Sequence, residues 1–138
     1  MDWTLALIVA VGMAAGWLLK HSAFVADDHA RQLLSTGALV LDVRSPEEFC
    51  RGHVPGALNL PLGQVRDKIS QHVKDKSQVL LVHCLSGGRS AIAAQQLKSL
   101  GYMNVFNLGS LSRAQRFCAV APNKKSTPQG APENQTET

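Results

Sequence analysis

The sequence has few cysteines and only a small excess of positive charge, which argues against disulfide-rich, zinc-binding and nucleic-acid-binding proteins. It holds only three cysteines, Cys50, Cys84 and Cys118, with no CxxC motif and no His/Cys cluster at zinc-ligand spacing. An odd number of cysteines favours free thiols over a disulfide framework. The 14 basic and 10 acidic residues leave a net charge of +4, and no basic stripe with interleaved aromatic residues is present. We therefore expect small anionic substrates, no metal site and no nucleic-acid binding.

Charge is absent from the first part of the chain, where residues 3–19 form an uncharged apolar run. As a helix this run would extend about 25 Å, somewhat short of the ~30 Å hydrocarbon core of a bilayer. Tryptophans lie near both of its ends, as in membrane interfaces. A cleaved signal peptide is the alternative, but Asp2 and no basic residue precede the run. The sequence therefore predicts a transmembrane anchor over residues 1–22, with membrane contact through residues 3–19.

The charges beside this run predict an orientation. The positive charges of Lys20 and Arg31 follow the run, and the α-amine is the only positive charge that precedes it. The positive-inside rule then places a single-pass protein's catalytic domain in the cytoplasm, where reducing conditions keep thiols free; a periplasmic or exported domain is the alternative. Gly12 and Gly16 have the spacing of a helix-pairing face and suggest a dimer, although small residues filling an ordinary span explain them equally well.

From residue 23 to residue 121 short apolar runs alternate with helical patterns. Strands are predicted at residues 24–25, 38–43, 57–60, 78–83 and 104–108, and helices at residues 27–34, 45–51, 62–72, 89–100 and 111–117. This alternation predicts an α/β domain with a central parallel sheet flanked by helices in three layers. Residues 122–138 contain no large apolar residue and are predicted to form a disordered polar tail.

One loop between a predicted buried strand and a helix carries the chemistry. Residues 83–90 read His-Cys-Leu-Ser-Gly-Gly-Arg-Ser, so Cys84 follows the strand and Arg89 opens the helix. Backbone amides and the positive end of a helix dipole meet at such a turn, where they bind anions and favour a thiolate. We predict that Cys84 is an activated nucleophile and that Arg89 binds an anion bidentately. An incidental cysteine in a glycine-rich turn is the alternative.

The other residues of this loop form a candidate binding site. The two glycines permit backbone angles that aim successive amides inward, and the two serines offer hydroxyl donors to the sulfur or to a bound oxyanion. The predicted substrate-binding residues are Leu85, Ser86, Gly87, Gly88 and Ser90.

Three ordered blocks of this sequence resemble those of single-domain rhodaneses. Residues 84–90 resemble the family's active-site loop, residues 41–49 (LDVRSPEEF) its upstream signature, and residues 52–61 (GHVPGALNLP) a second block. The resemblance implies a rhodanese-like fold and a sulfurtransferase that needs no metal or organic cofactor. Such an enzyme would take a sulfane sulfur from a small anionic donor such as thiosulfate. It would carry that sulfur as a Cys84 persulfide and deliver it to cyanide or a thiol.

The resemblance also indicates supporting residues and one departure. Asp42 and Arg44 lie in the upstream block, and Asp42, at the end of a buried strand, needs a partner such as Arg44. We expect a structural role for Asp42 and a minor role at the edge of the substrate for Arg44. Relatives often continue after the last strand with a Gly-Gly-Trp motif, whereas residues 109–111 here read Gly-Ser-Leu. The missing tryptophan leaves the substrate specificity open.

Two other functions remain as alternatives. Four residues separate Cys84 from Arg89, as in rhodanese sulfurtransferases, whereas related phosphatases and arsenate reductases carry five. The shorter loop suits a sulfane sulfur better than a tetrahedral phosphate, so a small phosphatase or arsenate-reductase-like enzyme is the second hypothesis. A non-enzymatic binding module is the third, and the presence of Cys84 argues against it.

Overall fold

Strands and helices alternate along the chain in the computed structural model, which describes residues 2–21 and 24–118, the side chains of residues 18–21 excepted. The elements are α1 (Trp3–His21), α2 (Asp27–Ser35), β1 (Leu39–Asp42), α3 (Pro46–Arg51), β2 (Leu58–Asn59), the 3₁₀ helix η1 (Leu62–Gln64), α4 (Val65–His72), β3 (Leu80–His83), α5 (Gly88–Ser99), β4 (Val105–Gly109) and α6 (Leu111–Cys118). The predicted domain boundaries at residues 22–23 and 121–122 and the polar tail lie outside the described residues.

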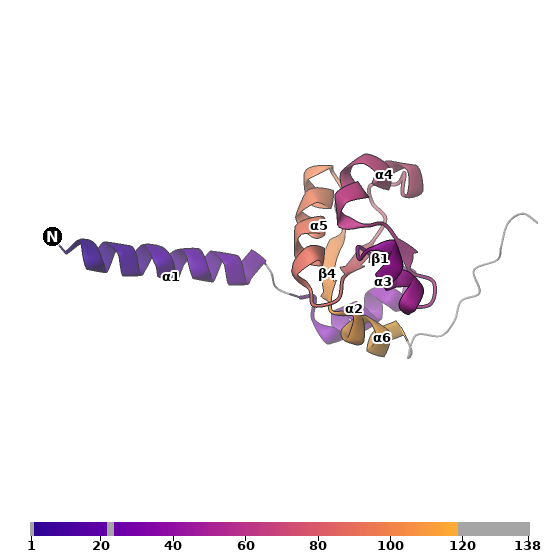
Figure 1. Ribbon diagram of the computed structural model, residues 1–138, viewed down its shortest axis with the longest axis horizontal. Coiled ribbons are helices and arrows are strands. Elements are labelled where there is room, and N and C mark those ends of the chain that lie inside the picture. The colour runs from indigo at the N-terminus through magenta and orange to yellow at the C-terminus, as the bar shows by residue number, and fades with distance from the viewer. Residues whose placement is uncertain (1, 22–23, 119–138) are drawn as a thin grey trace, which may run out of the picture.

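The strands form one parallel sheet in the order β2-β1-β3-β4. Helices α4 and α5 pack against one face of this sheet, and α2 and α6 lie on the other (Figure 1). All four residues of β3 are buried, as expected for a parallel strand that is covered on both faces. The predicted α/β fold with a central parallel sheet flanked by helices is therefore confirmed.

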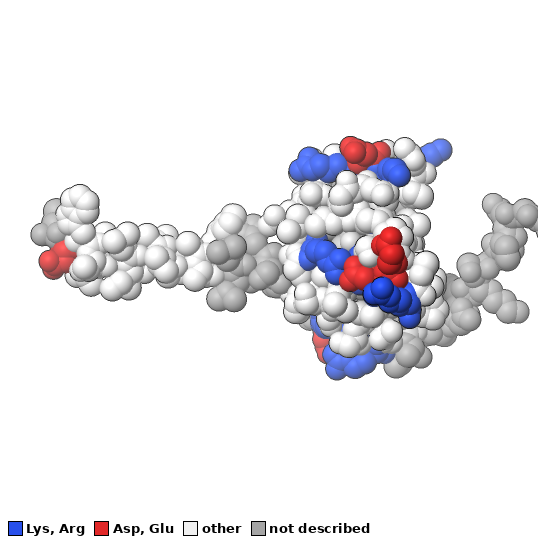
Figure 2. All heavy atoms as spheres, viewed as in Figure 1, with Lys and Arg blue, Asp and Glu red and all other residues white. Residues whose placement is uncertain are grey.

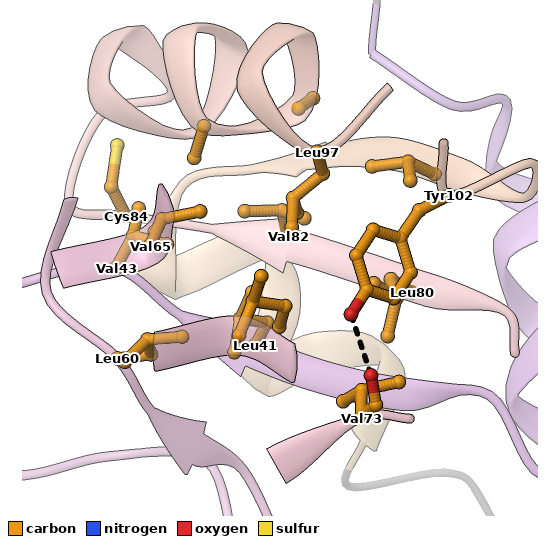
Figure 3. Close-up of a cluster of buried hydrophobic side chains, with 14 residues drawn as sticks. Leu41, Val43, Leu60, Val65, Val73, Leu80, Val82, Cys84, Leu97 and Tyr102 are labelled. Atoms are coloured by element: carbon orange, nitrogen blue, oxygen red, sulfur yellow. Dashed lines mark hydrogen bonds between the residues drawn. The ribbon is translucent and has the colours of Figure 1, made fainter. Parts of the chain in front are cut away.

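Two clusters of buried apolar side chains fill the spaces above and below the sheet. Alternation along β1 sends Leu41 and Val43 into one cluster and Val40 into the other. Cys84 lies at one end of the first cluster, with its sulfur directed away from Val43 and Val65 (Figure 3). The candidate nucleophile is thus anchored at the edge of the packed core.

Three local predictions differ from the structure in detail. Residues 24–26 are not a strand, because only one backbone bond, from the Val25 amide to the Asn107 carbonyl, connects them to β4. The sequence predicts Asp27 or Asp28 as the cap of the helix over residues 27–34, but α2 has Ala26 at its N-cap. Its two aspartates therefore occupy the first turn, where they face the positive end of the helix dipole. The helix predicted over residues 62–72 begins with the 3₁₀ turn η1 before α4.

The predicted transmembrane anchor is not supported. Helix α1 extends from the folded domain, and the side chains of residues 3–17 are exposed (Figure 1). Among the described residues, no helix is both long enough and apolar enough to cross a bilayer. The single-pass topology, membrane contact, cellular location and pairing through Gly12 and Gly16 stay untested predictions.

Candidate active site

The first two residues of the loop between β3 and α5 are bonded to the last residue of β4 and the first residue of α6. The Cys84 amide donates to the Gly109 carbonyl at 3.1 Å, and the Leu111 amide donates to the Leu85 carbonyl at 3.3 Å. These bonds join the carboxyl ends of two neighbouring parallel strands, which is where open α/β sheets place their ligands.

Gly87 is the residue that turns this loop back onto the cysteine. Its φ angle of 105° is in the left-handed region, and it forms the N-cap of α5. In this conformation its amide donates to Cys84 Sγ at 2.9 Å, and its carbonyl accepts from Ser90 Oγ at 3.0 Å. A Cβ atom at position 87 would lie 2.7 Å from Cε1 of the Phe24 ring, so a side chain there would require the ring or the loop to shift.

Asn107, on the neighbouring strand β4, holds the loop in place through hydrogen bonds of its side-chain amide. Its Oδ1 accepts from Ser90 Oγ at 2.7 Å and from the Gly109 amide at 3.0 Å, and its Nδ2 donates to the Gly87 carbonyl at 3.4 Å. Sequence reasoning missed both Asn107 and Phe24. Asn107 was one polar residue within a predicted strand, and Phe24 lies 63 positions before Gly87, so neither carried a local signal.

The surroundings of Cys84 favour its thiolate. The residue is only 1 % exposed. Burial raises the pKa of the Cys84 thiol, but hydrogen bonds from the amides of Ser90, Gly87 and Ser86 outweigh it, so that the pKa lies below its usual value. These donors are fixed backbone groups at the start of a helix, which also contributes its positive dipole end.

We expect Cys84 to react with a small alkylating agent at pH values where an ordinary thiol is protonated. Because only the thiolate is nucleophilic, a lowered pKa moves the rise of the rate to lower pH. Cys118 is an internal comparator, since burial raises the pKa of its thiol. Peptide mass spectrometry after timed iodoacetamide treatment across pH 5–10 would give both profiles. A Cys84 midpoint at or above that of Cys118 would contradict the activation.

Arg89, the predicted anion ligand, already holds a carboxylate. Its Nη1 donates to Glu48 Oε2 at 2.8 Å and its Nη2 to Glu48 Oε1 at 2.9 Å. The hydrogen bonds from Arg89, and a further one from the Ser45 backbone, hold the pKa of Glu48 at about 2. Figure 2 shows acidic and basic side chains next to each other on the face that carries α3. Glu48 is a candidate site residue that the sequence presented only as part of a helix start.

The structure pairs Asp42 with Arg44 as expected. Arg44 donates from Nε and Nη2 to the Asp42 carboxylate at 3.0 and 2.7 Å, and it also donates to the carbonyls of Glu48 and Gly52. Both residues are almost completely buried, with Arg44 3 % exposed. These contacts agree with support of α3 and leave Arg44 little surface for contact with a substrate.

The buried ring of His83 lies between the backbone of Cys84 and the Asp42–Arg44 ion pair. Its Nδ1 donates to the Cys84 carbonyl at 3.1 Å, and its Nε2 lies 3.6 Å from Asp42 Oδ2. Burial lowers the pKa of His83, which favours the neutral ring. The His83 ring is thus hydrogen-bonded to the Cys84 carbonyl and lies beside the Asp42 pair without a hydrogen bond to it.

The members of the predicted binding loop divide by exposure. Three are exposed, namely Leu85, Ser86 and Gly88, and two are buried, namely Gly87 and Ser90. Ser90 Oγ is bonded to the loop itself, so it shapes the site. The residues that can meet an incoming molecule are accordingly the exposed loop residues and the partly exposed Arg89. Within residues 2–21 and 24–118 no group of three or more His, Cys, Asp or Glu side chains could hold a metal ion.

Comparison with known proteins identifies the family. Residues 26–113 match the model of the rhodanese-like domain. The chain belongs to this family. The rhodanese-like domain here is 41 % identical over 71 residues to thiosulfate sulfurtransferase PspE of Escherichia coli, and the match covers 51 % of this chain and 68 % of PspE. It is 36 % identical over 69 residues to the putative sulfur carrier protein YrkF of Bacillus subtilis, covering 50 % of this chain and only 36 % of that longer protein.

Solved structures agree with the assignment. The human single-domain sulfurtransferase TSTD1 superimposes on this rhodanese-like domain with a TM-score of 0.57 and 30 % sequence identity, covering 66 % of this chain and 92 % of that one. The expected fold and family are thereby confirmed. The relatives named sulfurtransferases place the chain in a sulfurtransferase family.

Proposed function

We propose that this chain is a rhodanese-type sulfurtransferase that carries a sulfane sulfur on Cys84. The observation that supports this best is the position of the Cys84 sulfur beneath inward-facing amides at the start of α5, with Gly87 N–H 2.9 Å from Sγ. Such donors stabilise a sulfur anion, either the resting thiolate or the terminal sulfur of a persulfide. The relative PspE is named a thiosulfate sulfurtransferase, which is consistent with this chemistry.

In the first half-reaction the Cys84 thiolate attacks the outer sulfur of thiosulfate. A Cys84–sulfur bond forms as the donor's sulfur–sulfur bond breaks, and sulfite leaves with the electron pair. The product is the anionic persulfide Cys84–S–S⁻, so charge is unchanged across the step. In the second half-reaction a nucleophilic acceptor, cyanide or a thiolate, takes the outer sulfur and regenerates the Cys84 thiolate. Neither half-reaction needs a metal or an organic cofactor.

The loop amides stabilise the sulfur anion in both half-reactions. They lower the pKa of the attacking thiol and then hold the negative persulfide in a site that is nearly closed to water. Arg89, beside the loop, adds a positive charge that its ion pair with Glu48 partly offsets.

The test is intact mass spectrometry of the full chain after incubation with thiosulfate. We expect a gain of one sulfur, about 32 Da, that disappears on addition of cyanide and is absent from Cys84→Ser. Cys118→Ser is the matched control, because it also removes a partly buried thiol yet lies on α6, and it should keep the mass gain. A folded chain without the gain, especially one that hydrolyses an aryl phosphate, would refute the proposal and favour the phosphatase-like alternative.

A further inference from the structure

The charge of Arg89 is already balanced in the structure. Both terminal nitrogens of its guanidinium bond to the two oxygens of Glu48, at 2.8 and 2.9 Å, in the bidentate geometry that an anionic substrate would otherwise take. Arg44, the other arginine bonded to the α3 segment, is paired with Asp42. The loop therefore offers amides to an anion, and its nearest arginine is occupied.

Glu48 is held in this position by the helix on which it lies. Its Oε2 also accepts from the Ser45 amide at 2.9 Å, and Ser45 Oγ accepts from the Glu48 amide at 3.2 Å, which makes a complete capping box at the start of α3. Its pKa of about 2 keeps the carboxylate charged at any ordinary working pH. A substrate must therefore compete with a fixed, permanently ionised carboxylate for Arg89.

The exposed side chain of Leu85 is a second feature of the loop that bears on the choice of substrate. Leu85, directly after the nucleophile, is 56 % exposed, so its side chain can contact a molecule that enters the loop. An apolar group on the donor would cover this surface when the donor binds. The loop thus combines an exposed apolar side chain, Leu85, with an arginine, Arg89, whose charge is paired with Glu48.

We propose that Glu48 is a specificity-determining residue, which makes the site prefer a monoanionic sulfur donor bearing an apolar group over the dianion thiosulfate. This inference rests on the proposed function and names its substrate class. An aryl thiosulfonate, Ar–SO₂–S⁻, is the matched probe, because it replaces one charged oxygen of thiosulfate with an apolar ring. The Cys84 thiolate attacks its outer sulfur, the sulfur–sulfur bond breaks, and the arenesulfinate Ar–SO₂⁻ leaves with the electron pair, giving the same Cys84 persulfide.

The experiment compares Glu48→Gln with Glu47→Gln in the full chain. Both variants remove one negative charge from adjacent positions, but Glu47 is exposed and makes no ion pair in the described part of the chain. Glutamine at position 48 keeps an oxygen for the Ser45 amide and gives up the charge that occupies Arg89. For Glu48→Gln we expect the KM for thiosulfate to fall about tenfold, with the KM for benzenethiosulfonate within about twofold of wild type. Glu47→Gln should change each KM by less than about twofold.

Protection of Cys84 from iodoacetamide by sulfate separates this inference from the proposed function, because it needs no sulfur transfer. Sulfate, a dianion like thiosulfate, should protect Glu48→Gln at about tenfold lower concentration than it protects wild type or Glu47→Gln. Equal protection of the two variants would overturn the role of Glu48. Weaker protection in Glu48→Gln would also overturn it, since the carboxylate would then aid anion binding. Absence of the mass gain with both donors, together with the expected protection, would refute only the sulfurtransferase proposal.

Discussion

Replacing Asp42 with alanine should lower the free energy of unfolding by about 3–5 kcal/mol, the typical effect of breaking a buried ion pair from one side. The Arg44 guanidinium, 3 % exposed, would lose three of its hydrogen bonds and keep a charge in the interior. The Arg44 amide would also lose its acceptor, Asp42 Oδ1, at 3.0 Å. The loss is large because the remaining charge has little access to water.

Asp28→Ala is the matched control for this prediction. Its carboxylate is fully exposed and lies 3.7 Å from Arg31, so its removal should change the free energy of unfolding far less than Asp42→Ala does. Urea unfolding of both variants at neutral pH would measure the difference. A loss below about 1 kcal/mol for Asp42→Ala would mean that water or a neighbouring carbonyl solvates Arg44, and that the pair is not a main support of the site.

Most of the fold could be predicted because its signals are local. The four observed strands are short apolar runs. The start of α3 is indicated by Ser45 and Pro46, whose capping and N1 roles depend only on adjacent residues. The exceptions are set by contacts distant in sequence. Residues 24–25 were predicted as a strand, but only one backbone hydrogen bond, from the Val25 amide, connects them to β4. For α1, the apolar residue types predicted a membrane span, which the described residues do not support.

The candidate site divides in the same way. Cys84, Gly87 and Arg89 lie within six consecutive positions, so a strand, a tight turn and a helix start were enough to indicate a reactive loop. Glu48 comes from a helix 41 positions earlier, and its approach to Arg89 depends on where α3 packs. Asn107 reaches the loop only because β4 pairs with β3. Sequence reasoning thus found the nucleophile, and the tertiary structure added the residues that adjust its surroundings.

The residue whose replacement should affect the nucleophile most, short of removing it, is Gly87. In Gly87→Ala the methyl group would lie 2.7 Å from Cε1 and 2.8 Å from Cζ of Phe24, and the backbone would keep a φ of 105° that costs a non-glycine residue about 1–3 kcal/mol. Either the Phe24 ring, which is 49 % exposed, or the loop must shift to relieve this contact, and alanine at this φ strains the loop in either case. A shift of the loop moves the amide that lies 2.9 Å from Cys84 Sγ. We expect persulfide formation from thiosulfate to slow by at least about 100-fold, the effect of misplacing a catalytic group by about 1 Å.

Two further variants separate the collision from the backbone strain. Gly56→Ala places a methyl group at a φ of 79° with no atom within 4 Å, so it should lower stability and leave persulfide formation within about twofold of wild type. Removing the ring in Phe24→Ala/Gly87→Ala should recover part of the lost rate, because the amide can return toward the sulfur. Stopped-flow measurement of the first half-reaction on folded protein reports these rates directly. If Gly87→Ala reacts as fast as wild type, or if the double variant is slower still, the Gly87 amide does not control the reactivity of Cys84.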